Sequence, residues 1–466
     1  MNDNPRFEAS KLEKYQQAQG MTNATPPAFS EEALALEFAD RHNFCVRHVA
    51  AWNQWMLWDG KVWRQEKTLL VYDLCRRLCR EFAADCSIKE ETRRRLASST
   101  TVAAVISLVR SDRRIAATID QWDCGDWTLN TPGGLIDLKT GILRITVPGD
   151  YLTKITAVGP GGDCPLWRGF LARITGDDEN LQAYLQRVAG YCLTGVTREH
   201  ALFFLFGHGA NGKSVFIDTI MNVLADYGRS APIETFVASS SDRHPTDIAG
   251  LRGARLVTAA ETEEGRRWAE SKIKALTGGD RITARFMRQD YFEYQPQFKL
   301  IIAGNHKPSL RSVDEAIRRR FNLIPFTVTI PPEERDETLT EKLRDEAPAI
   351  LAWAIAGCLE WQRVGLSPPK VVTEATALYL EAEDSVTEWI DECCQRDPQA
   401  FESTATLFAS WQGWAERSGE TVGSQKRLVQ ALEAHGFTRE RFQGNRGLFG
   451  LRLSRSDPKG GYGDFD

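Results

Sequence analysis

Residues 201–214 read ALFFLFGHGANGKS, an apolar run followed by a glycine-rich loop that ends in Lys-Ser. The apolar run has the length and composition of a buried β-strand, and the residues from Val215 to Ala225 are typical of a helix. The loop fits the pattern G-x-x-x-x-G-K-S, in which backbone N–H groups close around phosphate oxygens at the start of a helix. The sequence therefore predicts a nucleotide-binding domain of the α/β class.

The loop supplies eight candidate nucleotide-binding residues: Gly207, His208, Gly209, Ala210, Asn211, Gly212, Lys213 and Ser214. We expect Lys213 to reach the outer phosphates and the Ser214 hydroxyl to bind Mg²⁺, so ATP and Mg²⁺ are the expected cofactors. The alternative is a glycine-rich turn on a buried strand, which leaves the adjacent lysine and serine unexplained.

The composition is that of a soluble protein with several domains. The chain has 466 residues, of which 42% are hydrophobic and 26% charged, and its net charge is −5. That charge excludes a protein that coats nucleic acid through an overall positive charge, but it allows local basic surfaces. We find neither a run of ~18 apolar residues nor a signal-peptide pattern, which predicts a cytoplasmic protein with no membrane partner. The ten cysteines lack zinc-ligand spacing, so reduced core thiols are expected.

We divide the chain into four parts. Residues 1–30 are polar and predict a mobile tail. Residues 31–165 are rich in tryptophan, which indicates core packing more than a base-stacking platform; a helix is expected from Leu69 to Phe82 and a hairpin over 133–144. Residues 166–375 predict the phosphate-binding core with flanking helices, and residues 376–466 predict a further unit.

Acidic residues follow a second apolar run. Residues 255–260 predict a short buried strand, after which come Glu261, Thr262, Glu263 and Glu264. A carboxylate at the end of a strand beside the phosphate loop can hold Mg²⁺, and a second one can deprotonate the attacking water. A solvated acidic turn is the alternative. We favour the metal and base roles, with Glu261 ahead of its neighbours.

Two more signals follow within the same span. Residues 298–304 predict a strand that ends at Asn305, whose amide can hydrogen-bond the attacking water or the γ-phosphate if this strand neighbours the loop strand. A lone asparagine after a strand is otherwise a turn residue. Arg318, Arg319 and Arg320 then form a basic cluster. Such a cluster can neutralise charge on the γ-phosphate of a nucleotide bound to a neighbouring subunit. The alternative is that the arginines form the solvated end of a helix.

Together these segments resemble superfamily 3 helicases, and more closely the phage and plasmid primase-helicase family related to the poxvirus primase-helicase. The resemblance includes KALTGGDRITAR at 274–285, WDGKVW at 58–63 and LNTPGGLIDL at 129–138, and it covers most of residues 45–455. It implies an AAA+-like ATPase core, preceded by a mixed α/β helicase-associated domain over 31–165.

The same resemblance implies a ring, usually a hexamer, that translocates on single-stranded DNA and unwinds a fork during replication of a phage, plasmid or other mobile element. A bacterial host cytoplasm would then be its location. On matching positions Lys213 and Ser214 would serve phosphate and Mg²⁺, and Glu261 the metal, with Glu263 or Glu264 assisting. Asn305 would be the sensor of the γ-phosphate, and Arg319 or Arg320 would be the arginine finger that reaches the nucleotide of a neighbouring subunit.

Many members of this family carry a primase domain upstream. Only about 30 to 45 residues precede the matching region here, too few for such a fold. We therefore expect no primer synthesis by this chain alone, and a separate primase or replisome protein as partner.

Residues 280–297 alternate like a hairpin just before the Asn305 strand. We expect it to enter the pore of the ring, where Arg285 and Arg288 would track phosphates and an aromatic such as Phe286 or Tyr291 would touch bases. The alternative is that the aromatics pack the hairpin against the core.

Residues 376–466 predict helices followed by a hairpin with its turn at 444–447, a winged-helix outline. Its excess of arginine suits duplex or origin DNA, with protein docking as the alternative.

The predicted function is an ATP-dependent DNA helicase. The main alternative is a winged-helix DNA-binding ATPase that controls assembly without unwinding. A small-molecule kinase using the same loop, or unwinding of RNA, also remain open.

Overall fold

The fold is described from a computed structural model of the chain. The structure describes residues 25–238, 246–260, 266–285, 291–310, 313–382, 385–420, 422–442 and 445–454. The chain divides into two compact units, one of residues 1–124 with 145–155 and the other of 125–144 with 156–466. The sequence boundary expected at 165 thus differs from this division, because residues 125–144 and 156–165 belong to the second unit. Each unit is described by itself.

The first unit combines helices with a small sheet. The helices are α2 (Glu31–His42), α3 (Leu70–Ala83), α4 (Glu90–Leu96) and α5 (Ser99–Val109). The strands are β1 (Val46–Val49), β2 (Gln54–Trp58), β3 (Trp63–Gln65) and β4 (Ala116–Ala117), in the order β3-β2-β1-β4. The helix expected from Leu69 to Phe82 is confirmed as α3, whose Val71, Leu78 and two cysteines are buried.

Tryptophans of the first unit form a small core of their own. Trp63 and Trp122 are buried with their ring centroids 5.7 Å apart, and Trp52 and Trp58 pack around them. This arrangement confirms the packing interpretation of these side chains.

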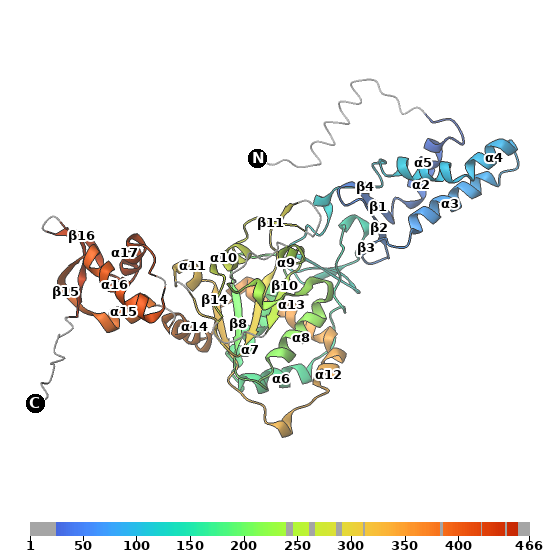
Figure 1. The fold of residues 1–466 in the computed structure, drawn as a ribbon. Helices are drawn as coiled ribbons and strands as arrows, with labels where there is room; N and C mark the ends of the chain where they lie inside the picture. The colour runs from blue at the N-terminus through green and yellow to red at the C-terminus, as the bar shows by residue number, and fades with distance from the viewer. Residues whose placement is uncertain are drawn as a thin grey trace, which may run out of the picture. The chain divides into compact units, whose positions relative to one another are not determined.

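The second unit is built on a parallel sheet. Its strands are β8 (Leu202–Phe206), β9 (Gly228–Ser230), β10 (Leu256–Ala260), β13 (Lys299–Gly304) and β14 (Phe321–Pro325). Their order is β14-β8-β13-β10-β9, and every neighbouring pair is parallel (Figure 1). A strand covered on both faces is apolar throughout, which explains why β8 could be read as a continuous apolar run. The predicted α/β class is confirmed.

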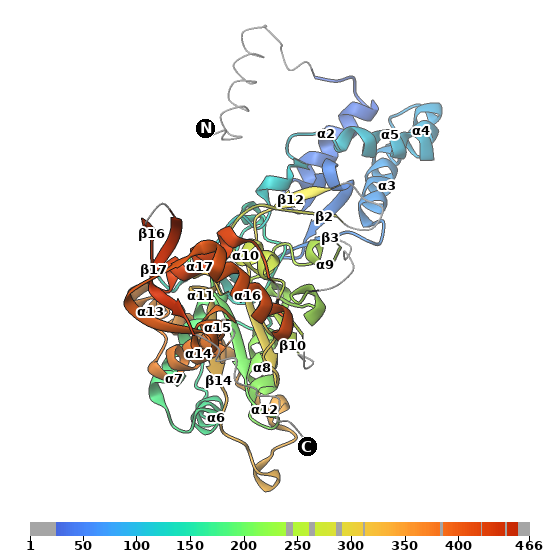
Figure 2. The ribbon, with the colours of Figure 1, turned by 60° about the vertical axis from the view of Figure 1, so that its left-hand side comes forward.

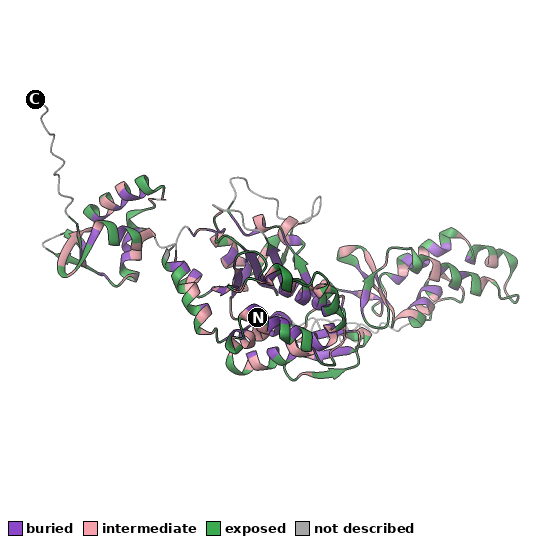
Figure 3. Ribbon diagram, turned by 90° about the horizontal axis from the view of Figure 1, so that it is seen from below, coloured by how far each residue is buried: buried purple, intermediate pink, exposed green. Residues whose placement is uncertain are grey.

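Helices cover both faces of this sheet. Phe203 and Leu205 of β8 face a core that includes α6 (Pro165–Thr175), α7 (Glu179–Cys192), α8 (Lys213–Leu224) and α13 (Ala347–Val364). Leu202 and Phe204 face the opposite core, which includes residues of α9 (Thr246–Ala249), α10 (Glu270–Gly278), α11 (Glu315–Arg318) and α14 (Lys370–Ala382). The short α12 (Leu339–Asp345) precedes α13. The central strands stand out as buried in Figure 3.

Two small antiparallel sheets belong to the same unit. The first contains β5 (Thr128–Thr131), β6 (Gly134–Asp137) and β7 (Ile142–Arg144), which confirms the hairpin expected over 133–144. The second pairs β11 (Ile282–Ala284) with β12 (Phe292–Tyr294), which confirms the hairpin expected over 280–297. Residues 286–290, with Phe286 and Arg288, lie outside the described residues.

The C-terminal part has its own hydrophobic core, to which Trp389, Trp411 and Trp414 contribute. Its elements follow one another as α15 (Ser385–Cys393), β15 (Cys394–Ser403), α16 (Thr404–Ser418), α17 (Gln425–Ala434), β16 (Thr438–Phe442) and β17 (Asn445–Leu453). The three strands form an antiparallel sheet in the order β15-β17-β16, and α16 packs on β17 (Figure 2). The expected pairing of β16 with β17 is present, but residues 445–447, which were expected at its turn, already pair within β17.

Within the described parts of the chain, no helix is both long enough and apolar enough to span a bilayer.

Candidate nucleotide-binding site

Two glycines shape the loop between β8 and α8. A Cβ at Gly207 would lie 2.2 Å from the carbonyl oxygen of Phe326, so a side chain there would collide with the segment that follows β14. Gly212 has φ +83°, and a Cβ there would lie 2.5 Å from Cγ2 of Ile174 in α6. Only glycine satisfies both the left-handed backbone and the close contact at position 212. The loop is therefore held tightly against the sheet and α6.

Lys213 is the first residue of α8 and is buried. Its Nζ donates to the carbonyl oxygen of Gly207 at 2.5 Å, to Oδ1 of Asn211 at 3.0 Å and to Oδ1 of Asn305 at 3.3 Å. Among the described residues no carboxylate forms an ion pair with it, and burial lowers the pKa of its ammonium group. A buried cation held only by neutral oxygens is costly, so the site suits an anion such as phosphate.

The loop is also held from behind. Nδ2 of the buried Asn211 donates to the carbonyl oxygen of Phe326 at 3.1 Å, and the backbone N–H of Ile330 donates to the carbonyl oxygen of Ala210 at 2.8 Å. His208, Gly209 and Ala210 remain exposed. The segment 326–330 was not identified from the sequence as part of the site, because it carries no motif and acts through its backbone.

The carboxyl ends of three strands lie level beside the loop. Phe206 of β8 pairs with Gly304 of β13, and Ala303 of β13 pairs with Ala260 of β10. Asn305 directly follows β13, and its contact with Lys213 confirms the expected neighbourhood of these two residues.

The predicted acidic residues fall where the structure gives no description. Glu261, Glu263 and Glu264 follow β10 in the chain but lie outside the described residues. Ser214 is exposed in the first turn of α8, next to Lys213. A serine hydroxyl and a carboxylate are oxygen donors of the kind that Mg²⁺ takes. Within the described residues no cluster of histidine, cysteine, aspartate or glutamate could hold a metal ion.

The three arginines at the end of α11, Arg318 to Arg320, have different surroundings. Arg320 is buried; its Nη1 donates to the carbonyl oxygen of Ala316 at 2.7 Å, and its Nε donates to Oγ1 of Thr277 at 3.1 Å. Burial lowers the pKa of its guanidinium group. Arg319 is exposed, whereas Arg318 is half-buried. Of the two arginines expected to reach another molecule, Arg319 is exposed and Arg320 is buried.

The β11–β12 hairpin carries an exposed aromatic and a neighbouring cation. Tyr291 leaves 59% of its surface exposed, and the guanidinium of Arg285 lies 4.7 Å from the centre of the Tyr291 ring. This arrangement keeps a stacking surface and a positive charge together at the described end of the hairpin.

Two buried cations at the opposite ends of the strands were not identified from the sequence. Arg255, which precedes β10, donates to the carbonyl oxygens of Leu193 at 2.6 Å and Gly125 at 2.8 Å. Lys299, the first residue of β13, donates to the carbonyl oxygens of Thr194 and Val196, and burial lowers its pKa to about 7. They satisfy carbonyl groups after α7 and, in the case of Arg255, also that of Gly125, and so serve the fold. The signal in the sequence that could have identified them was a basic residue at the start of an apolar run.

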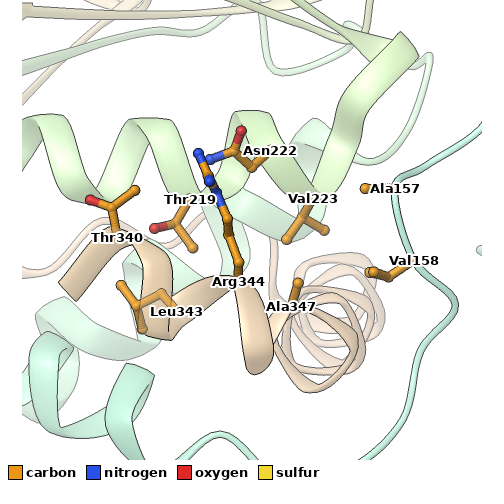
Figure 4. Close-up of a pocket in the computed structure, with 9 residues that line it drawn as sticks. All are labelled: Ala157, Val158, Thr219, Asn222, Val223, Thr340, Leu343, Arg344 and Ala347. Carbon is orange, nitrogen blue, oxygen red and sulfur yellow. The ribbon is translucent and has the colours of Figure 1, made fainter. Parts of the chain in front are cut away.

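A cavity of about 290 Å³ lies elsewhere in the same unit (Figure 4). Its walls include Thr219 and Asn222 of α8 and Arg344 of α12. Thr219 is six residues beyond Lys213, or about 9 Å along the helix. The cavity is thus separate from the phosphate loop.

Comparison with known proteins gives two family matches. Residues 31–176 match the family described as "D5 N terminal like", and residues 205–320 match a family of unknown function (DUF5906). Two solved structures of the NrS-1 C-terminal region align with 90% and 91% of this chain, at 11% and 10% identity and TM-scores of 0.47 and 0.49. The alignments cover 98% and 100% of the two solved chains.

Several viral proteins are also similar to this chain in sequence. The chain is 27% identical over 293 residues to a putative helicase of Acanthamoeba polyphaga mimivirus, which covers 58% of this chain and 30% of the relative. It is 25% identical over 283 residues to a putative helicase of Frog virus 3, covering 55% and 29%. It is 27% identical over 157 residues to the primase D5 of Fowlpox virus, covering 32% and 19%. The chain thus spans less than a third of the length of these relatives. The match to the D5 N-terminal-like family and the viral relatives support a primase-helicase-like family for this chain.

Proposed function

We propose that the chain is an ATP-dependent DNA helicase that acts in replication. The observation that carries the proposal is Lys213, a buried cation without a carboxylate partner among the described residues, which lies 3.3 Å from the Asn305 amide at the end of a parallel sheet. An amide in that position can hydrogen-bond the γ-phosphate or orient the water that attacks it. The names of the viral relatives support a helicase over other users of the same loop.

In this proposal ATP binds with its phosphates in the loop 207–212 and against Lys213. Mg²⁺, which neutralises charge on the phosphates, would be held by Ser214 and Glu261. Asn305 would hold the attacking water or the γ-phosphate, Glu263 or Glu264 would assist Glu261, and one of these three carboxylates would accept the proton of the attacking water. The tight backbone around Gly207 and Gly212 keeps these donors in place before the nucleotide arrives, which lowers the cost of binding.

Coupling to DNA would need several copies of the chain. Arg319 is exposed and can be offered to the nucleotide of a neighbouring copy, which a closed ring supplies at every interface. Arg285, Arg288 and Tyr291 would contact a single strand in the pore. A hexamer is the ring size that the family resemblance favours.

One experiment separates this function from its main alternative. The chain is mixed with a forked DNA whose strands carry a fluorophore and a quencher, together with ATP and Mg²⁺, and strand separation is followed over time. We expect separation by the wild-type chain and none by Lys213→Ala, whose circular dichroism spectrum should stay unchanged. If the wild-type chain hydrolyses ATP in the presence of DNA but never separates the strands, the protein is an ATPase that controls assembly.

A further inference from the structure

Three phenylalanines lie together on the outer face of the C-terminal sheet. They are Phe401 of β15, Phe442 of β16 and Phe449 of β17. Ring centroids are 5.4 Å apart for Phe401 and Phe442, 5.2 Å for Phe401 and Phe449, and 5.7 Å for Phe442 and Phe449. None of them belongs to the core of this part, which Leu448 enters from the other face of β17. Each of the three strands therefore contributes one ring to a surface cluster.

The strand register explains how this cluster forms. Phe401 pairs with Phe449, and Glu402 pairs with Leu448 on the opposite face. A Cβ at Gly447 would lie 2.3 Å from the ring of Phe401, so the glycine lets that ring lie against the backbone of β17. Phe442 stands beside it with 45% of its surface exposed. An exposed aromatic supported by two others offers a ring face to a binding partner.

The other face of the same hairpin is positively charged. Arg441 pairs directly with Arg446 across β16 and β17, and Arg439 pairs with the buried Leu448. All three arginines are exposed, and none forms an ion pair with any residue that the structure describes. Glu440, the acidic residue of β16, lies on the face of Phe442 and not on the face of the arginines. Like charges directly opposite each other destabilise a strand pair. An anion bound between Arg441 and Arg446 would therefore relieve the repulsion between their guanidinium groups.

We propose that the β16–β17 hairpin binds single-stranded nucleic acid. An unpaired base stacks on the exposed ring of Phe442, and the nucleic-acid strand then passes over the edge strand β16, so that neighbouring phosphates meet Arg441 and Arg446 on the other face. A single strand is favoured over a duplex because a base inside a duplex is already stacked on both sides and cannot offer its face to the ring. The proposal concerns the C-terminal sheet and does not depend on ATP hydrolysis at Lys213.

Photo-cross-linking can locate such a contact directly. The full chain, without nucleotide, is mixed with a 20-nucleotide DNA containing 5-iododeoxyuridine, irradiated and digested, and the cross-linked peptides are identified by mass spectrometry. We expect cross-links within the peptides that contain Phe401, Phe442 or Phe449. Cross-links confined to other peptides would overturn the proposal.

Affinity measurements supply the second test. Fluorescence anisotropy with a labelled single strand should give a Kd roughly tenfold weaker for Phe442→Ala, as loss of one stacked base predicts. Phe442→Tyr keeps the ring and should bind like the wild type. Leu378→Ala, which removes an exposed apolar side chain of α14, should also bind like the wild type. Arg441→Gln should reduce the salt dependence of binding as well as the affinity.

The outcomes are distinguishable from failure of the proposed function. Equal affinity of Phe442→Ala and the wild type, with unchanged thermal unfolding, would overturn the proposal and leave the cluster as a protein-docking surface. If Phe442→Ala weakened the binding of a blunt duplex as much as that of a single strand, the proposal would also be overturned, because stacking on an unpaired base would then be excluded. An RNA strand of the same length tests whether the 2′-hydroxyl matters. Absence of strand separation by a chain that still cross-links at the hairpin would count against the helicase alone.

Discussion

At the scale of single residues, Asn305 joins the sheet to the phosphate loop. Its Oδ1 accepts a hydrogen bond from Lys213, and the register of β8 and β13 brings the two residues together. We expect Asn305→Ala to leave ATP affinity within about threefold of the wild type, since Lys213 and the loop N–H groups remain. Turnover should fall by ~10²-fold, the usual effect of losing one preorganised donor. Steady-state hydrolysis and binding of a fluorescent ATP analogue measure the two quantities. Parallel loss of both would show that Asn305 only supports the loop.

The neighbouring Arg319 and Arg320 should behave differently because one is exposed and the other buried. Arg320→Ala removes donors to Thr277 and Ala316 and opens a buried site, so it should cost about 1–3 kcal/mol of stability. Arg319→Ala should change stability by less than about 0.5 kcal/mol. Thermal unfolding of the two variants compares them directly. A lower midpoint for Arg319→Ala than for Arg320→Ala would contradict the assignment of the exposed role to Arg319.

At the scale of elements, sequence pattern was most informative where strands are buried on both faces. β8, β10 and β13 appear as apolar runs because helices cover both sides of the sheet, and the predicted site residues follow the carboxyl ends of these runs. The antiparallel hairpins were recognisable from alternation and turn residues. The turn of the last hairpin was misplaced, because the glycine at 447 serves the packing of Phe401 and does not form the turn.

Contacts between distant segments could not be obtained from pattern alone. Asn211 and Phe326 are 115 positions apart, and Lys299 reaches carbonyl groups 105 positions away. The roles of Arg255 and Lys299 depend on the end of α7, which no local motif connects to them. The same reason explains why Arg320 resembled a finger in the sequence. Its burial depends on Thr277 of α10, which is 43 positions away.

The β11–β12 hairpin allows a prediction at this scale. Tyr291 is exposed and lies under the guanidinium of Arg285, so its removal should affect nucleic acid more than nucleotide. We expect Tyr291→Ala to reduce the stimulation of ATP hydrolysis by single-stranded DNA about fivefold or more, the loss of one stacked base. Hydrolysis without DNA should stay at the wild-type rate. Tyr291→Phe keeps the ring and is the matched control. Equal stimulation in Tyr291→Ala and the wild type would mean that the strand passes elsewhere.

At the scale of the whole molecule, the proposed function has each chain supply most of a nucleotide site and offer an exposed arginine to the site of a neighbouring copy. Lys213, Ser214 and Asn305 lie at one edge of the sheet, whereas Arg319 follows α11 and is exposed. A residue offered between subunits predicts that hydrolysis depends on assembly. The rate per chain should therefore rise with protein concentration until the ring is complete.

Mixing two inactive variants tests this dependence. Lys213→Ala lacks the phosphate-binding cation but keeps Arg319, and Arg319→Ala has the opposite composition. In an equal mixture about a quarter of the interfaces of a closed ring would combine an intact loop with an intact arginine. We therefore expect hydrolysis to recover to about a quarter of the wild-type rate, while each variant alone stays inactive. The double variant mixed with the wild type controls for passive dilution. No recovery, in a mixture that forms assemblies of wild-type size by light scattering, would show that Arg319 acts within its own chain or has no part in hydrolysis.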